Sequence, residues 1–418
     1  MRVLIVGGGG REHAIAWKLK QSPRISQLFC APGNAGIAEL AVCVPIKATD
    51  LDALVLFARS EAIDLVFVAP DDPLALGLVD RLEAAGIRAF GPRSQAAVLE
   101  SSKAFAKDLM RRYRIPTADY QVFDDVKAAL AHVAGAELPL VVKADGLALG
   151  KGVVIAHERE EARAAVTDMM VNSRFGQAGQ KLVIESFLSG PELTLLAFTD
   201  GRTIHPMVTS RDHKRACDND QGLNTGGMGA VAPGADLDEN AWRQLRETIL
   251  QPTVDAMRAE GRPFKGVLYF GLMLTQDGPK VIEYNARFGD PEAQVVLPLL
   301  ETDLLDIIEA ILDERLDQLE IRWKSGAACC VVAASGGYPA AYQTGYPILG
   351  LDKVPSDCLV FHAGTRREGD AVLTSGGRVL GVTALGRTVE EAVGRAYRAL
   401  DVIAFKDMHA RRDIGRRP

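Results

Sequence analysis

Residues 2–14 read RVLIVGGGGREHA, an apolar run that passes directly into four glycines and then into a helix-like stretch. The run predicts a buried strand over residues 2–6 and a helix that continues to residue 20. Further strands are expected at residues 27–30, 65–69 and 89–90, and helices at residues 51–60 and 73–85. Alternating strands and helices with short turns predict a parallel sheet covered on both faces.

The four glycines invite comparison with a dinucleotide-binding fingerprint, and the comparison fails. Gly7 and Gly9 match its first two positions, but Glu12 stands at the third, and no acidic residue follows the strand at residues 27–30. These differences weigh against an NAD-dependent dehydrogenase. A glycine loop before a helix N-terminus still offers free N–H groups to an anion such as phosphate. The alternative is a merely tight turn.

After Gly91 the alternation of strands and helices ends, and a charged helical stretch begins. Residues 138–156 predict strand, glycine-rich loop and strand, and residues 181–207 predict three more strands in antiparallel pairs. Residues 266–274 and 280–292 predict a hairpin around Asp277-Gly278. A small α+β unit follows Trp323, with a helix at residues 388–400. We expect domains at residues 1–102, 103–190, 191–325 and 326–418, the second being a lid with its linker helix.

Composition excludes several classes of function. The 418 residues are 48% hydrophobic and 24% charged, as in ordinary soluble proteins, and the net charge of −6 gives no electrostatic case for nucleic acid. No stretch approaches the length of a membrane span, and Met1 leads directly into a strand with no room for a signal peptide. The six cysteines form no CxxC pair, which predicts buried thiols in a reducing compartment and a cytoplasmic protein.

Glu283, Asn285 and Arg287 follow one another at intervals of two residues. Side chains alternate between the faces of a strand, so all three would point the same way. One face would then carry a carboxylate, an amide oxygen and a fixed cation, which suits Mg²⁺ and phosphate. The alternative is a solvated edge strand with mixed polar residues.

Three other loops carry candidate binding residues. DGLALGKGV at residues 145–153 resembles a Walker A loop, but its spacing is one residue short and no Ser or Thr follows Lys151. It suits a mobile flap over polyphosphate, with Lys143 aimed at the same place, although a solvated hairpin tip is the alternative. DHKR at residues 212–215 and NTGGMGA at residues 224–230 combine charge with close backbone approach, where binding residues often collect.

Together these pieces resemble one family. VLIVGGGGREHA, PGNAG, SSKAFAK, VVKADGLALGKGV, DHKR, NTGGMGA, EYNARFGDPE and RRDIG occur in this order over essentially the whole chain. They resemble the glycinamide ribonucleotide synthetase (phosphoribosylamine–glycine ligase) family of the ATP-grasp superfamily. The resemblance implies an α/β and α+β multidomain protein, with a parallel α/β pre-ATP-grasp domain, a two-part ATP-grasp domain and a small C-terminal α+β domain.

The resemblance also implies a reaction of de novo purine biosynthesis. An enzyme of this family uses ATP and Mg²⁺ (or Mn²⁺) to activate glycine as glycyl phosphate and joins it to 5-phosphoribosylamine. The implied partners are these small molecules, with no nucleic acid and no membrane, in a monomer that contacts other purine-pathway enzymes transiently. Two alternatives stay open, namely another ATP-grasp carboxylate–amine ligase and a catalytically silent nucleotide-binding module.

The resemblance assigns roles to individual residues. It makes Glu283 and Asn285 metal ligands and gives catalytic roles to Arg287, Lys143, Asp212 and Lys214. Residues expected to bind the nucleotide are Lys103, Lys143, Gly150, Gly152, Glu185, Phe187, Leu188 and Glu192. Residues expected to bind the other substrates are Gly9, Gly10, Asn34, Gly36, Asn224, Thr225, Gly226, Asp290 and Pro291. Asp71 stands where the family usually has a longer glutamate.

Overall fold

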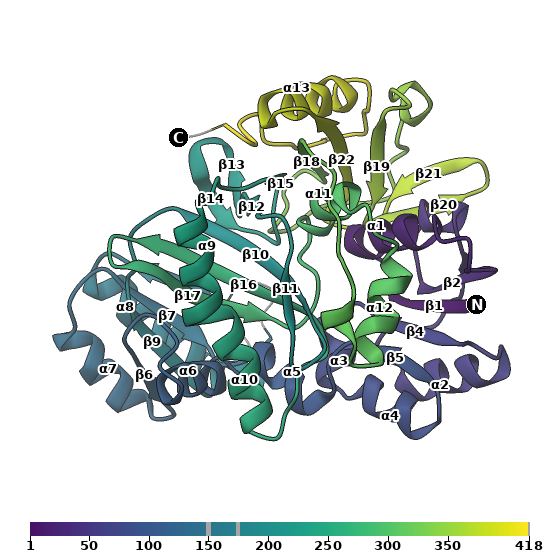
Figure 1. Ribbon diagram of the computed structural model, residues 1–418. Helices are drawn as coiled ribbons and strands as arrows, with labels where there is room; N and C mark the ends of the chain where they lie inside the picture. Colours follow the sequence, from purple (N-terminus) through teal and green to yellow (C-terminus); the bar gives the residue numbers. More distant parts are fainter. Residues whose placement is uncertain (148–151, 173–175, 417–418) are drawn as a thin grey trace.

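The computed structural model describes residues 1–147, 152–172 and 176–416 (Figure 1). Its N-terminal sheet is parallel throughout, with strand order β3-β2-β1-β4-β5. The strands are β1 (Arg2–Gly7), β2 (Gln27–Pro32), β3 (Val42–Cys43), β4 (Leu65–Val68) and β5 (Arg88–Phe90). The helices of this unit are α1 (Gly10–Leu19), α2 (Leu51–Ser60), α3 (Asp71–Ala75) and α4 (Leu78–Ala84). The predicted parallel α/β architecture is confirmed.

Two predicted helices are each broken in two. The helix expected at residues 73–85 is interrupted at Gly77, whose φ of 86° is left-handed, and so becomes α3 and α4. The charged stretch after Gly91 forms α5 (Ser94–Ser101) and α6 (Lys103–Arg112). Ser102 separates them in an extended conformation, and its hydroxyl accepts a hydrogen bond from the backbone N–H of Phe105 at 3.1 Å.

Two four-stranded sheets follow. The first has the order β6-β9-β7-β8, all antiparallel, and the second has the order β11-β10-β16-β17. The first contains β6 (Tyr120–Phe123), β7 (Leu140–Ala144), β8 (Val153–Ala156) and β9 (Leu182–Ser186), with helices α7 (Val126–Gly135) and α8 (Arg159–Val166). The second contains β10 (Glu192–Thr199), β11 (Ile204–Pro206), β16 (Gly266–Thr275) and β17 (Gly278–Asn285), with helices α9 (Glu239–Leu245) and α10 (Gln251–Ala259). The predicted hairpin is confirmed, because β16 and β17 pair antiparallel from Thr275 and Gly278 outward.

The last large sheet combines distant parts of the chain. Its order is β12-β15-β18-β22-β19, so strands near residues 211–232 pair with strands beyond residue 326. These strands are β12 (Arg211–Asp212), β15 (Gly229–Ala232), β18 (Ala327–Ala334), β19 (Cys358–His362) and β22 (Arg378–Gly386), covered by α13 (Val389–Leu400). Two hairpins stand beside it, β13 (Arg215–Cys217) with β14 (Gln221–Asn224), and β20 (Thr365–Glu368) with β21 (Ala371–Thr374). The domain boundaries proposed above stay a prediction.

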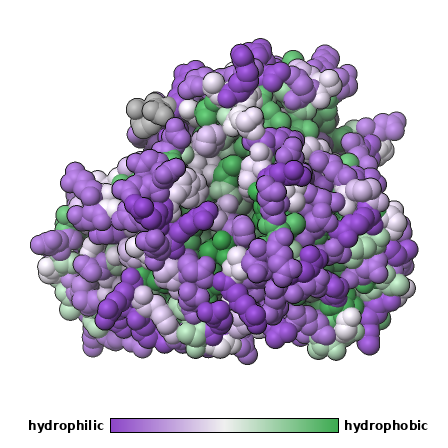
Figure 2. Space-filling model, in the orientation of Figure 1, coloured by the Kyte–Doolittle hydropathy of each residue, from purple (hydrophilic) through white to green (hydrophobic). Residues whose placement is uncertain are grey.

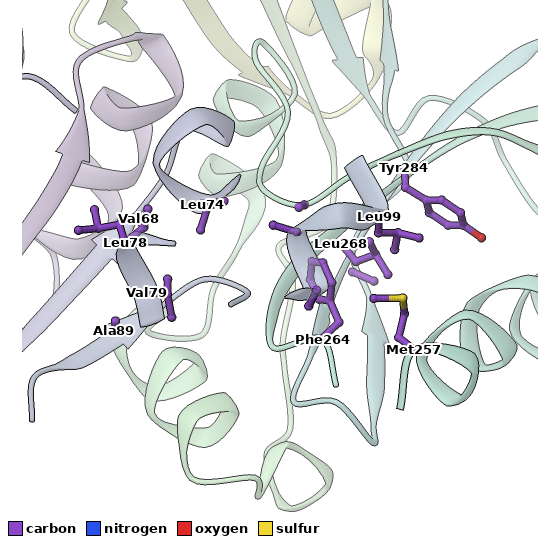
Figure 3. Close-up of a cluster of buried hydrophobic side chains, with 14 of the residues drawn as sticks. Val68, Leu74, Leu78, Val79, Ala89, Leu99, Met257, Phe264, Leu268 and Tyr284 are labelled. Atoms are coloured by element: carbon purple, nitrogen blue, oxygen red, sulfur yellow. The ribbon is translucent and has the colours of Figure 1, made fainter. Parts of the chain in front are cut away.

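Apolar packing joins the N-terminal unit to the β16–β17 sheet. In Figure 3, Leu99 of α5 lies near Met257, Phe264, Leu268 and Tyr284, which belong to one continuous buried cluster with the N-terminal core. Two short helices, α11 (Ala293–Val296) and α12 (Leu304–Leu312), carry a second cluster toward α1. The face of the molecule seen in Figure 2 is mostly hydrophilic, with hydrophobic residues gathered near its centre. Shared cores of this kind fix the angles between the sheets, and so the shape of the space between them.

Two further findings concern membrane-spanning helices and the cysteines. Among the described residues, no helix has the length and apolar character needed to cross a membrane. All six cysteines, each in a described segment, are free thiols. The expectation that they are buried is confirmed for Cys30, Cys329 and Cys330. Cys43 and Cys358 are only partly buried, and Cys217, at the end of β13, is exposed.

Candidate active site

A cavity of about 490 Å³ opens where the four sheets approach one another. Side chains from every unit reach its wall, and most of them are charged. They include Arg11, Asp71, Glu100, Lys103, Lys107, Lys143, Glu185, Asp212, Lys214, Tyr269, Glu283, Asn285, Arg287, Asp290, Glu292, Tyr338 and Arg378. Desolvating charged groups costs free energy, and a cluster of them in one cavity is typical of a functional site.

Strand β17 delivers the proposed metal ligands to this cavity. Glu283 and Asn285 face it, while Tyr284 between them turns into the core and shares a 2.9 Å hydrogen bond with Thr253. Opposite Glu283 in β16 lies Gly271, where a Cβ atom would come within 3.0 Å of the glutamate Cγ. The glycine therefore leaves room for the carboxylate. β17 is an edge strand, as the alternative of a solvated polar strand requires, but these side chains lie in the cavity.

The donor set fits a magnesium ion. Burial would raise the pKa of Glu283, but the charges of Lys214, Lys143, Lys103 and Arg287 outweigh burial and lower it. Glu283 is therefore an ionised carboxylate at neutral pH. Asn285 adds a neutral amide oxygen two residues away, and hard cations prefer such oxygen ligands.

The lysines expected to face the nucleotide come together at one side. Lys143 Nζ lies 2.9 Å from Glu185 Oε1 and 3.1 Å from the carbonyl oxygen of Ile282. Lys103 Nζ donates to the carbonyl oxygen of Gly146 at 2.9 Å, where the glycine-rich loop begins. Burial lowers the pKa of Lys103. Gly152 lines the cavity, whereas Gly150 lies outside the described residues.

Glu185 holds two lysines rather than one. Its second oxygen lies 2.8 Å from Lys107 Nζ, and Lys107 also donates to Thr117 Oγ1 at 2.7 Å. Burial lowers the pKa of Lys107 to about 8. Both carboxylate oxygens of Glu185 are thus engaged by ammonium groups, so its predicted contact with the nucleotide would be shared with these ion pairs. Lys107 was missed by the sequence reasoning, although KAFAK places it one helical turn after Lys103.

Three of the residues predicted to bind the nucleotide are not among the described residues that line the cavity. Phe187 is 38% exposed, and neither Phe187, Leu188 nor Glu192 is among the residues that line the cavity in the described part of the chain. Glu192 Oε2 instead lies 3.2 Å from Lys214 Nζ. Their roles in nucleotide binding stay predictions.

Asp212 and Lys214 reach the cavity from one short segment. Lys214 Nζ is 3.9 Å from Asp212 Oδ1, and the charges of Asp212 and Glu192 raise the pKa of Lys214 against the effect of burial. Thr225 fixes the segment, because both its backbone N–H and its hydroxyl donate to the carbonyl oxygen of Lys214 at 2.8 Å. Lys214 therefore stays cationic, and its charge acts on Glu283.

The glycine loop after β1, where phosphate binding is predicted, already contains a carboxylate. Gly9 is the N-cap of α1, and its N–H donates to Glu12 Oε2 at 2.5 Å. A Cβ atom on Gly8 would lie 2.5 Å from the carbonyl oxygen of Gly33, and one on Gly10 would lie 2.5 Å from Gln294 Nε2. The N–H of Gly9 is thus engaged before any phosphate binds.

Asn34 and Gly36 act on the loop itself. The Asn34 amide donates to the carbonyl oxygens of Gly8 and His362 at 2.9 and 2.8 Å, and its oxygen accepts from the N–H groups of Gly36 and Ile37. All hydrogen-bonding positions of that side chain are therefore filled. A Cβ atom on Gly36 would lie 2.5 Å from the His13 ring. Direct substrate contact by either residue stays a prediction.

The loop after β14, which contains Gly226, and the residues after β17 both contact an arginine from the C-terminal sheet. Arg378 Nη1 donates to the carbonyl oxygens of Gly226 and Asp290, both at 2.7 Å, and Nη2 lies 3.3 Å from Asp290 Oδ2. Burial would raise the pKa of Asp290, but the charges of Arg378 and Arg11 lower it. Pro291 follows Asp290 through a cis peptide bond, and Asn224 ends β14 two residues before Gly226; direct substrate contact by either residue stays a prediction.

Arg287 is held by acids from the N-terminal unit and from α5. Its Nη2 lies 2.7 Å from Glu100 Oε1 and 3.8 Å from Asp71 Oδ2. Glu100 Oε2 accepts from the N–H of Ala286 at 2.7 Å, so one carboxylate fixes both the side chain and the backbone at this point. The shorter Asp71 thus reaches the cavity beside Arg287.

Comparisons with known proteins show the family of the chain. The family model described as "Phosphoribosylglycinamide synthetase, ATP-grasp (A) domain" matches residues 101–293, and the models of the N and C domains match residues 1–100 and 328–417. The chain belongs to the phosphoribosylglycinamide synthetase family. A phosphoribosylamine–glycine ligase from Allochromatium vinosum is 52% identical to this chain over 100% of the chain and 98% of that protein.

Solved structures support the same fold for this chain. The phosphoribosylamine–glycine ligase of Thermotoga maritima matches with a TM-score of 0.88 and 32% identity, covering 99% of this chain and 100% of that one. A biotin carboxylase domain from Hydrogenobacter thermophilus, solved with MgADP and bicarbonate, matches with a TM-score of 0.75 and 16% identity, covering 98% and 91%. The second likeness concerns the fold alone.

Five charged cavity residues were missed by the sequence reasoning, namely Arg11, Glu100, Lys107, Glu292 and Arg378. Glu292 could most easily have been found from the sequence, because it ends the RFGDPE motif. Burial and the charge of Asp212 raise its pKa to about 7. Arg378 and Glu100 had no local signal, since their partners are 88 and 187 positions away along the chain.

Proposed function

We propose that the protein is a phosphoribosylamine–glycine ligase that uses ATP and Mg²⁺ in de novo purine biosynthesis. The observation that carries the proposal is the ionised Glu283 beside Asn285, facing a cavity rich in lysine and arginine, in a chain of this family. The substrates are small molecules, and we propose a cytoplasmic monomer. Another carboxylate–amine ligase would use the same cations, so an assay of substrate requirement must distinguish the two functions.

The reaction has two parts. The glycine carboxylate attacks the γ-phosphorus of ATP, which releases ADP and gives glycyl phosphate. The amine of phosphoribosylamine then attacks the carbonyl carbon, phosphate leaves with the bonding electrons, and the amine loses a proton as the amide forms. The product is glycinamide ribonucleotide.

The chain's own residues do the binding and orienting. Glu283 and Asn285 would hold Mg²⁺, which supplies charge neutralisation on the transferred phosphoryl group. Lys103 and Lys143 face the polyphosphate, and Arg287 faces the charge that develops during transfer. Such preorganised charges stabilise a transition state without reorganising solvent.

The remaining predicted residues form the acceptor side. Lys214 and Asp212 lie next to Glu283 and orient the reacting groups, while Asp290, Thr225 and Gly226 shape the space beside the glycine loop. Glycyl phosphate is labile to water, so a site enclosed by several units protects it until the amine arrives.

An ADP-release assay tests the proposal. Release should require both glycine and phosphoribosylamine, and neither NAD nor bicarbonate should change it. Turnover with another amino acid while glycine is inert would overturn the substrate assignment in favour of another ligase. MgATP binding with no turnover of any amino acid would instead favour a silent binding module.

A further inference from the structure

The last residues of the described chain lie against the segment that carries Lys214. After α13 the chain returns to β18, where His409 and Ala334 exchange backbone hydrogen bonds at 2.8 and 2.9 Å. It then crosses the β13–β14 hairpin and continues to residue 416 (Figure 1). We call residues 409–415 the C-terminal brace. Nothing in the ligase chemistry described above assigns these residues a role.

Five residues of the brace bond to the hairpin segment. His409 Nε2 lies 2.6 Å from the carbonyl oxygen of Ala216, and Arg411 Nη1 donates to the carbonyl oxygen of Arg215 at 3.1 Å. The other contacts involve one backbone N–H each, from Arg412 to Asp218 Oδ1 (2.7 Å), from Asn219 to Asp413 Oδ2 (2.8 Å) and from Gly415 to His213 Nε2 (3.1 Å). Residues 217–223 are all exposed, so the hairpin has little core of its own to hold it.

Arg411 is the centre of the brace. Its side chain is 1% exposed. Its guanidinium Nε and Nη2 donate hydrogen bonds to Asp413 Oδ1 and Oδ2, both at 2.8 Å. The same group reaches Asp220 Oδ1 at 2.8 Å in the hairpin. A buried guanidinium with three acceptors in a fixed plane defines one geometry, which a flexible ammonium group cannot reproduce.

These contacts fix the backbone on both sides of Lys214. On one side, His213 has its N–H bonded to Gly229 and its ring bonded to Gly415. On the other side, the carbonyl oxygen of Arg215 is bonded to Arg411. Burial lowers the pKa of His213 to about 4, so its ring is neutral and its Nε2 accepts the Gly415 hydrogen bond.

We propose that the C-terminal brace is a positioning element of the active site, in which Arg411 orders the hairpin segment so that Lys214 and Asp212 point into the cavity. This inference rests on the proposed ligase function. A misplacement of about 1 Å at a reacting group can cost a hundredfold in rate, so a brace outside the cavity can still control turnover. The plainer alternative is that the brace only stabilises the C-terminal sheet.

Paired charge-removing variants test the proposal. Arg411→Gln removes the buried guanidinium, and Arg416→Gln is the matched control, because Arg416 is exposed in the same tail. We expect Arg411→Gln to lower kcat/KM for phosphoribosylamine by about tenfold to a hundredfold. The KM for ATP should change by less than about threefold, because Lys103, Lys107 and Lys143 make none of the brace contacts above. Arg416→Gln should behave as the parent protein.

A gentler variant covers the case in which Arg411→Gln does not fold. Asp220 is exposed at the hairpin, and Asp220→Asn removes the negative charge that faces the guanidinium without touching the core. We expect the same selective loss in kcat/KM for phosphoribosylamine, with a smaller size, and faster hydrogen exchange over residues 213–220.

Two results would refute the proposal that the brace positions Lys214 and Asp212. One is faster exchange in the hairpin with unchanged kinetics, which would mean that its order does not matter to the site. The other is an equal loss in every kinetic parameter together with a lower melting temperature, which would indicate stabilisation alone. Absence of turnover in the parent protein would refute the ligase function itself, and the exchange measurement separates that failure from this one.

Discussion

Replacing Glu100 by Gln removes one negative charge from the contact that holds Arg287. The carboxylate now bridges the Arg287 guanidinium and the N–H of Ala286, both at 2.7 Å. Glutamine has the same shape but a single acceptor oxygen. Its NH₂ group would then face either the guanidinium or the N–H, and donors do not bond to donors.

The structure sets the size of the effect. The Glu100 and Arg287 side chains are 7% and 18% exposed, so the pair is largely buried. Removing one partner of a fully buried pair costs about 3–5 kcal/mol of unfolding free energy. Asp71 remains 3.8 Å from Arg287 and keeps it from being unpaired, so we expect a smaller loss of about 2 kcal/mol. In the variant we expect the Arg287 guanidinium to turn toward Asp71, and this misplacement should lower kcat about tenfold or more.

Urea unfolding followed by tryptophan fluorescence measures the first number, and ADP release measures the second. Glu61→Gln is the matched control, because Glu61 pairs with Arg2 at 2.6 Å but the two side chains are 42% and 34% exposed. That change should cost less than about 1 kcal/mol and leave kcat intact. If Glu100→Gln matches Glu61→Gln in both measurements, the reasoning from burial is refuted.

Three further changes have definite expected outcomes. Glu283→Gln should lower kcat about a hundredfold and raise the Mg²⁺ concentration needed for half-maximal ADP release; near-normal turnover at limiting Mg²⁺ would contradict the metal-ligand role. Gly8→Ala should destabilise the protein by about 3 kcal/mol in thermal melts, because its Cβ would lie 2.5 Å from the carbonyl oxygen of Gly33, whereas Gly135→Ala, with nothing within 4 Å, should be neutral. Burial and His362 lower the pKa of His13 to about 3, so below pH 6.5 the unfolded state binds a proton that the folded state does not. The unfolding free energy should therefore fall by about 1.4 kcal/mol per pH unit between pH 6.5 and 3 on account of His13, and a His13→Asn variant should lose that part of the slope.

Local patterns in the sequence predicted a large part of the fold. The apolar run before the glycines gave β1 and the start of α1, and Asp277-Gly278 placed the turn between β16 and β17. The same alternation that defines β17 put Glu283 and Asn285 on one face. These features depend on residues close in sequence, so their physical cause can be read from a short window.

Contacts between distant segments could not be predicted in this way. Nothing near Glu100 or Arg378 indicates that one bonds to Arg287 and the other to Asp290. The break at Gly77 was also missed, because a glycine within a helical pattern is compatible with either a continuous helix or a break. The neighbours of a residue in the folded chain decide such cases.

The sheet that pairs β15 with β18 has a consequence for how the gene can be divided. β15 comes from residues 229–232 and β18 from residues 327–334, with Gly229 opposite Val331 and Ala232 opposite Ala328. A polypeptide that stopped at residue 325 would expose the edge of β15, and the complementary fragment would begin with the unpaired edge of β18. Open edges of this kind pair readily with other chains. Neither fragment is therefore expected to remain monodisperse alone, whereas the two halves supplied together would complement each other across this edge.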